Sequence, residues 1–98
     1  MSWADHAIEE LRRGERCMVT PHGNSMTPKI NSGDRDTLEP VQLSDLKVGD
    51  IVLCKVKGNV YLHLVKAVGE GRVLIGNNHG HTNGWTRTVY GKAIYFGQ

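Results

Sequence analysis

Apolar positions near the start of the chain follow a helical pattern. Large and small apolar side chains recur there every three or four residues, with charged residues between them: Trp3, Ala7, Ile8 and Leu11. This spacing predicts one amphipathic helix over residues 2–14, with Ser2 as N-cap, Asp5 as its capping-box partner and Gly14 as the stop. We expect the large side chains of the apolar face to dock this helix on the rest of the domain.

From residue 17 onward the pattern changes to short segments of strand character separated by Gly, Pro, Asn and Asp. The clearest segment is IVLCKVKGNVYLHLVKAV, residues 51–68, in which apolar and polar positions alternate on both sides of Gly58-Asn59. This predicts a long hairpin that turns at the dipeptide. Shorter strands are expected in CMVT, DTLEPV, RVLIG and TRTVYGKAIYF, whereas NNHGHTNG is expected to be a loop.

These elements predict a mainly β fold, an all-β barrel or rolled sheet with a short N-terminal helix. The length of 98 residues predicts one domain over residues 1–98, with the β core in residues 17–98. A hydrophobic content of 39% and a charged content of 22% are typical of a globular domain rather than a disordered chain.

Charge and hydropathy exclude several classes of function. The formal net charge is +2 and the basic residues are scattered, which argues against a nucleic-acid partner. No apolar stretch approaches the roughly 18 residues that span a bilayer, and the N-terminus lacks a signal-peptide segment. Cys17 and Cys54 are interpreted as free thiols in a reducing compartment, although one disulfide between them is an alternative. We therefore expect a cytoplasmic protein without a membrane span.

The stretch HGNSMTPKI, residues 22–30, holds the first candidate for chemistry. A nucleophilic serine needs a base within hydrogen-bond reach and backbone N–H groups aimed at the developing oxyanion. Gly23 permits a close approach of the backbone to a substrate, and Pro28 fixes the exit of the turn. Ser25 therefore has suitable neighbours for a presented nucleophile. The alternative is that Ser25 only caps a local turn.

Three motifs together resemble the signal peptidase I and LexA-type superfamily of serine peptidases. They are GNSMTPKINSGD, LKVGDIVLCKV and VYLHLVKAV, and the resemblance extends from about residue 19 to residue 96. It implies a rolled β-ribbon fold in which Ser25 is the nucleophile. It also implies that the backbone N–H of Ser25 or Met26 serves as an oxyanion donor.

The resemblance places the general base on the returning strand of the hairpin, at His63. Family members use either a lysine or a histidine there, and Lys66 lies three residues further on. Residues 63 and 66 of a regular strand face opposite sides, so only one of them can face Ser25. His63 is preferred because an imidazole is neutral near pH 7 without strong desolvation. The alternative is a strand histidine that bonds a backbone carbonyl.

One element of the family pattern is missing. Histidine-type members carry an aspartate in a Gly-Asp-Asn-Asn segment, whereas this chain has Gly76-Asn77-Asn78, followed by His79, His81 and Asn83. Asn83 could orient the imidazole but could not supply a negative charge. The resemblance therefore leaves two alternatives, a Ser–His dyad or a catalytically silent relative.

The histidines also allow a metal site to be considered. His79 and His81, with His22 and His63, have the ligand types that zinc or nickel prefers, but two histidines on a loop are a weak signal. We expect a polar loop rimming the cleft, with no metal and no cofactor.

The predicted function is that of a serine endopeptidase that cleaves a peptide or protein in trans. Self-cleavage in the style of the repressor relatives is not expected, because the 24 residues before Ser25 lack an Ala-Gly dipeptide. A helix-turn-helix is also absent from the pattern. A substrate could add as a strand beside the cleft. The alternative is a non-enzymatic peptide-binding or assembly module, and no oligomeric state is predicted.

Overall fold

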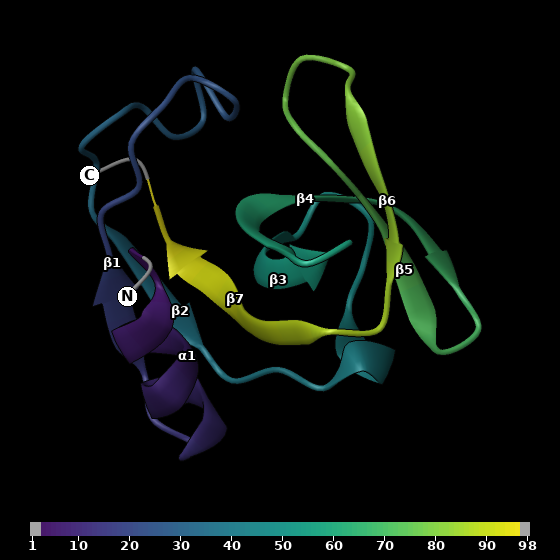
Figure 1. The fold of residues 1–98 in the computed structure, drawn as a ribbon, viewed down its shortest axis with the longest axis horizontal. Helices are drawn as coiled ribbons and strands as arrows, with labels where there is room; N and C mark the ends of the chain where they lie inside the picture. Colours follow the sequence, from purple (N-terminus) through teal and green to yellow (C-terminus); the bar gives the residue numbers. More distant parts are fainter. Residues whose placement is uncertain (1–2, 97–98) are drawn as a thin grey trace.

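The computed structural model describes residues 3–96, in which seven antiparallel strands form one curved sheet beside a short helix (Figure 1). The strand order is β1-β2-β7-β3-β4-β5-β6. This confirms the mainly β fold expected from the sequence. The elements are α1 (Asp5–Arg12), β1 (Cys17–Val19), β2 (Asp36–Glu39), the 3-10 turn η1 (Leu43–Asp45), β3 (Ile51–Val56), β4 (Asn59–Gly69), β5 (Arg72–Gly76), β6 (Thr82–Thr86) and β7 (Val89–Tyr95).

The helix is confirmed but is shorter than the predicted residues 2–14. It begins at Asp5, with Ala4 in the N-cap position and no side-chain cap hydrogen bond, so Asp5 is the first helical residue. Ser2 itself lies outside the described residues. At the other end Gly14 adopts φ 82° and donates to the Leu11 carbonyl at 3.0 Å, as expected of a glycine stop. No helix within residues 3–96 is long and apolar enough to cross a membrane.

The helix docks through two alanines, Leu11 and the partly buried Ile8, and not through Trp3. Ala4, Ala7 and Leu11 are buried against β1 and β7, whereas Trp3 keeps 44% of its surface exposed. The prediction that Trp3 docks the helix is therefore wrong. Alanines allow the helix to approach the sheet closely, and an indole at the same interface would hold it away.

A glycine in β7 makes this close approach possible, and it supports a stability prediction. A Cβ at Gly91 would lie 2.7 Å from the Glu39 carbonyl oxygen and 2.8 Å from a Leu11 methyl. We expect Gly91→Ala to destabilise the fold by about 1–3 kcal/mol through overpacking. A thermal melt should show a decrease in Tm of several degrees. Gly69→Ala is the matched control, because its nearest neighbour, at 3.2 Å, is the movable Trp85 ring. Equal melting of the two variants would contradict this packing.

The β3–β4 hairpin forms, but its turn lies one residue earlier than predicted. Val56 pairs with Asn59, so Lys57 and Gly58 occupy the turn, at φ 50° and 85°. Positive φ at both positions is typical of the type I′ hairpin turn. The strict polar alternation also fails in β3, where four consecutive residues, 51–54, are buried. Ile51 and Leu53 pack on the helix side, and Val52 and Cys54 pack in a second core on the other side.

The strand β6 was not predicted, since its first residues fall in the segment expected to be a loop. Asn83 and Gly84 are typical of turns, but the edge of β5 accepts this segment in antiparallel register. The Arg72 guanidinium lies over the Trp85 ring, 4.6 Å from its centroid, which helps hold β6 in place. Pairing with β5 therefore outweighs the local turn preference, and it places Asn83 on a strand.

Candidate active site

Ser25 lies on a turn in the long connection between β1 and β2. Met26 within the turn and Ile30 at its end are buried, and the Ile30 N–H donates to the Met26 carbonyl at 3.0 Å. The Gly33 N–H donates to the Pro21 carbonyl at 2.9 Å and closes the base of the connection. These anchors leave the Ser25 side chain exposed at the surface.

The β5–β6 loop holds this turn from the opposite side. The Asn78 backbone N–H donates to the Ser25 carbonyl, and its side-chain amide donates to the Thr27 carbonyl, both at 2.9 Å. His79 Nε2 lies 2.9 Å from the Asn24 carbonyl. Three carbonyls of the turn are thus held toward the loop. Within residues 3–96 the backbone N–H groups of Ser25 and Met26 donate to no backbone carbonyl.

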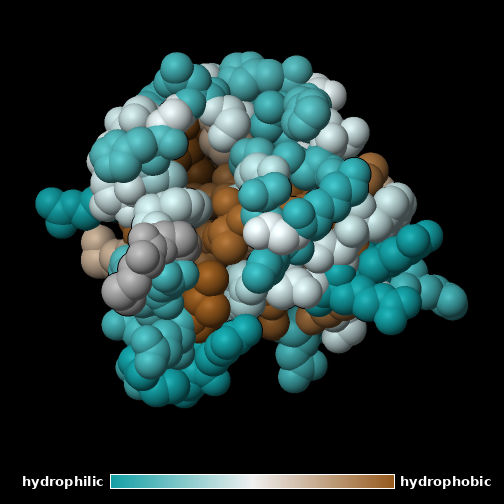
Figure 2. Space-filling model, in the orientation of Figure 1, coloured by the Kyte–Doolittle hydropathy of each residue, from teal (hydrophilic) through white to brown (hydrophobic). Residues whose placement is uncertain are grey.

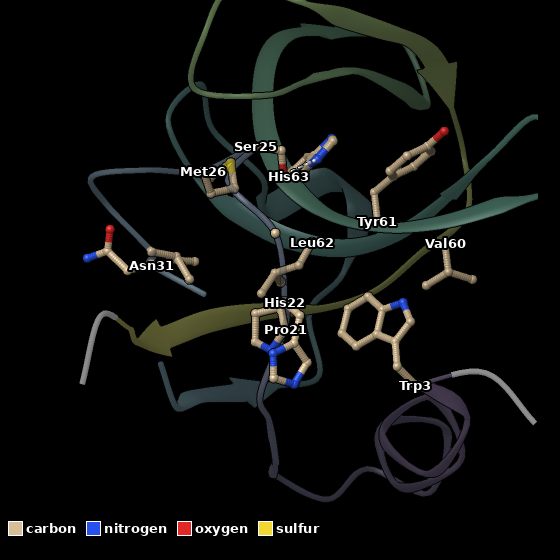
Figure 3. A pocket seen from close by; sticks show the side chains of 12 residues that line it. Trp3, Pro21, His22, Ser25, Met26, Asn31, Val60, Tyr61, Leu62 and His63 are labelled. Atoms are coloured by element: carbon tan, nitrogen blue, oxygen red, sulfur yellow. Dashed lines mark hydrogen bonds between the residues drawn. The ribbon is translucent and has the colours of Figure 1, made fainter. Parts of the chain in front are cut away.

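The structure brings three of the sequence-predicted site residues together. His63, on β4, places Nε2 3.0 Å from Ser25 Oγ, although the two residues are 38 positions apart in the chain (Figure 3). His63 Nδ1 lies 2.7 Å from Asn83 Oδ1, on β6. An amide oxygen only accepts hydrogen bonds, so Nδ1 carries the proton and Nε2 accepts from the Ser25 hydroxyl.

The comparison with known families gives a match over most of the chain. Residues 2–88 match the model of the Peptidase S24-like family, a match that spans Ser25, His63 and Asn83. The chain belongs to the Peptidase S24-like family. No curated protein matches the chain. The match confirms the resemblance to the LexA and signal peptidase superfamily.

The histidine of this S24-like chain is held in its neutral form. His63 is only 6% exposed, and burial is the main cause that lowers its pKa below 6.5. The hydrogen bond to Asn83 opposes this shift, and the positive charge on a protonated His81 adds to it. The Tyr61 ring stacks on the imidazole with centroids 4.8 Å apart, which further fixes its orientation. A neutral, oriented imidazole is suited to accept a proton from a hydroxyl.

The other candidate bases and ligands do not join this pair. Lys66 lies at a β-bulge between Val65 and Ala67, and its aliphatic chain packs near Gly76. His79 is engaged with the serine turn. Among the described residues no group of three or more His, Cys, Asp and Glu side chains is arranged to hold a metal ion.

The cysteines are free thiols, each buried in a different core. Burial raises the pKa of Cys54 to about 12 and also raises that of Cys17. Thiols that stay protonated are poor nucleophiles, so Ser25 has no competitor from these side chains.

A cavity of about 280 Å³ opens directly beside the Ser25–His63 pair. Figure 2 shows apolar surface gathered in a hollow on one face of the molecule. No pattern in the sequence predicted that Trp3 lines this cavity or that Asn78 and His79 support the serine turn. For the support of the serine turn, the only available signal was that Gly76-Asn77-Asn78 matches the glycine and asparagine positions of the family pattern.

Proposed function

We propose that this chain is a serine endopeptidase that cleaves a peptide or protein in trans, with Ser25 as nucleophile and His63 as general base. The observation that carries the proposal is the 3.0 Å contact between His63 Nε2 and Ser25 Oγ, with Nδ1 bound to Asn83. Membership of a peptidase-like family supports the class of substrate. Two buried free thiols are consistent with a cytoplasmic site of action.

The proposed chemistry follows from the hydrogen bonds of the pair. As Ser25 Oγ attacks a peptide carbonyl, its proton passes to His63 Nε2, and the N–H groups of Ser25 and Met26 bind the oxyanion. The imidazolium then protonates the leaving amine, and an acyl-enzyme remains. Water, deprotonated by the same imidazole, releases the acyl group and restores Ser25. Asn83 keeps the imidazole in the required tautomer throughout but contributes no charge.

The free edge of β4 supports binding of the substrate as an added strand. β5 pairs with β4 only from Leu64 onward, so residues 60–63 have no strand partner on that side among the described residues. Val65 bonds Gly49 and Asp50 on the β3 side through its backbone. Strand alternation therefore directs the N–H and C=O of Leu62 toward the open edge. A peptide strand that bonds Leu62 would run beside His63.

Covalent labelling tests the nucleophile directly. A serine-reactive acylating probe should add one adduct to Ser25 of the wild type, as read by intact mass and peptide mapping. Ser25→Ala should abolish the adduct, and His63→Ala should slow its formation. Ser44→Ala, an exposed serine in η1, is the control and should label like the wild type. Labelling that persists in Ser25→Ala would contradict the proposal.

The absence of an acidic residue at Asn83 favours one alternative, a silent relative that binds peptides without cleaving them. Without a carboxylate the imidazolium lacks a charged partner. Peptide binding with no adduct and no cleavage by the wild type would establish this alternative.

A further inference from the structure

The cavity beside the Ser25–His63 pair has apolar walls from three separate parts of the chain. Trp3 comes from the segment before α1, Met26 and Ile30 from the serine connection, and Val60 and Leu62 from β4 (Figure 3). Its volume of about 280 Å³ lies just below the range of about 300–1,000 Å³ for sites that hold a whole small molecule. The cavity therefore suits one or two side chains of a peptide.

The residues that line the cavity indicate which class of peptide side chain it can bind. No Lys, Arg, Asp or Glu is among the described residues that line the cavity, and its polar members beyond the Ser–His pair include His22 and Asn31. An ionised side chain would lose its hydration there without gaining a charged partner. A neutral apolar side chain would meet no such penalty.

Trp3 is the residue best placed to select a large side chain. The neighbouring Ala4 and Ala7 are buried against the sheet and fix the start of α1, which holds the indole at the cavity. The indole is nevertheless 44% exposed. An entering side chain would cover part of this apolar surface, and that burial favours binding. A side chain as small as that of alanine would leave much of the volume unfilled.

We propose that this cavity is the specificity pocket for a bulky apolar side chain, such as Leu, Met or Phe, next to the bond that is cleaved. Trp3 is its specificity-determining residue. That a bond next to the pocket is cleaved rests on the peptidase function proposed above, but the binding preference of the pocket can be measured without turnover.

The test measures binding to a full-length chain that cannot cleave. Ser25→Ala combined with Trp85→Phe leaves Trp3 as the sole tryptophan, because the sequence contains two. Blocked hexapeptide pools without Trp or Tyr, each with one position fixed as Leu, Phe, Ala or Asp, are titrated while Trp3 fluorescence is followed. We expect the Leu and Phe pools to shift the emission and to bind at least about tenfold more tightly than the Ala and Asp pools.

Trp3 variants separate specificity from folding. Calorimetric titration of Ser25→Ala/Trp3→Ala should show the preference for Leu and Phe lost, whereas Trp3→Phe should retain most of it. Trp85 lies outside the cavity, so Trp85→Phe alone should leave the preference unchanged. A thermal melt checks that each variant is folded.

A preference for the Ala pool, or a preference for Leu and Phe that Trp3→Ala leaves intact, would overturn the proposal. Selective binding of Leu and Phe pools without cleavage by the wild type would support the pocket and contradict the peptidase function. Absence of both binding and cleavage would overturn both.

Discussion

Ser25→Ala and His63→Ala are each expected to lower kcat/KM for a cleaved peptide by at least about a thousandfold. General-base catalysis contributes roughly 10²–10⁴-fold, and the loss of the nucleophile removes the covalent route altogether. Because the two side chains act through one hydrogen bond, at 3.0 Å, the double variant should lose little more than either single variant. Steady-state kinetics on one purified peptide measures all three.

The pH dependence of the wild type gives an independent check of the base. His63 accepts a proton only when neutral, so activity should rise with pH through its pKa and level off above it. Burial lowers this pKa, so the rise should centre below pH 6.5. A rise centred well above this value would point to a lysine as base.

His6→Ala provides the matched control for the kinetics. His6 lies on α1 and contacts the Met18 carbonyl, away from the site, so its loss should leave both kcat/KM and the pH profile unchanged. If His63→Ala retained the activity and the pH profile of the wild type, the general-base role would be overturned.

The Ser25–His63 pair was accessible from sequence because each residue lies in its own local motif. Ser25 lies in GNSMTP, and His63 lies in YLHLV on a strand whose hairpin partner is unmistakable. The hairpin fixes where the strand returns, even though the turn was placed one residue late. Asn83 was considered as an orienting residue because the family resemblance places an acid in its segment, and the structure places its side-chain oxygen 2.7 Å from His63 Nδ1.

Other features depend on contacts that leave no pattern in the sequence. Helical periodicity identifies an apolar face but not how closely that face approaches the sheet, and it does not show that Ala7 is buried there while Trp3 lines the cavity. The role of Asn78 is carried by bonds to backbone carbonyls of the serine turn, which any sequence could present. β6 forms because β5 offers an edge, which is a tertiary effect that outweighs local propensity.

Asn83→Asp is expected to increase the activity, and it tests how much catalytic rate is lost because residue 83 is not an aspartate. The amide oxygen of Asn83 already holds the correct imidazole tautomer, so only the charge is lacking. A hydrogen bond to a charged group contributes about 1.5–3 kcal/mol, compared with about 0.5–1.5 kcal/mol for a neutral one. The extra stabilisation of the imidazolium in the transition state corresponds to roughly a tenfold gain in kcat.

The same substitution should move the pH profile in a defined direction. A carboxylate beside Nδ1 favours the protonated imidazole, so the pKa of His63 should rise and the acidic limb should shift to higher pH. The gain is therefore expected on the plateau above the new pKa, and activity at pH 5 should increase less or decrease.

Asn83→Ala is the control. It removes the acceptor, releases the tautomer and should lower kcat with little change in KM. Equal kcat for the Asp, Asn and Ala forms would show that residue 83 does not act through His63, and the imidazole would then need another orienting group.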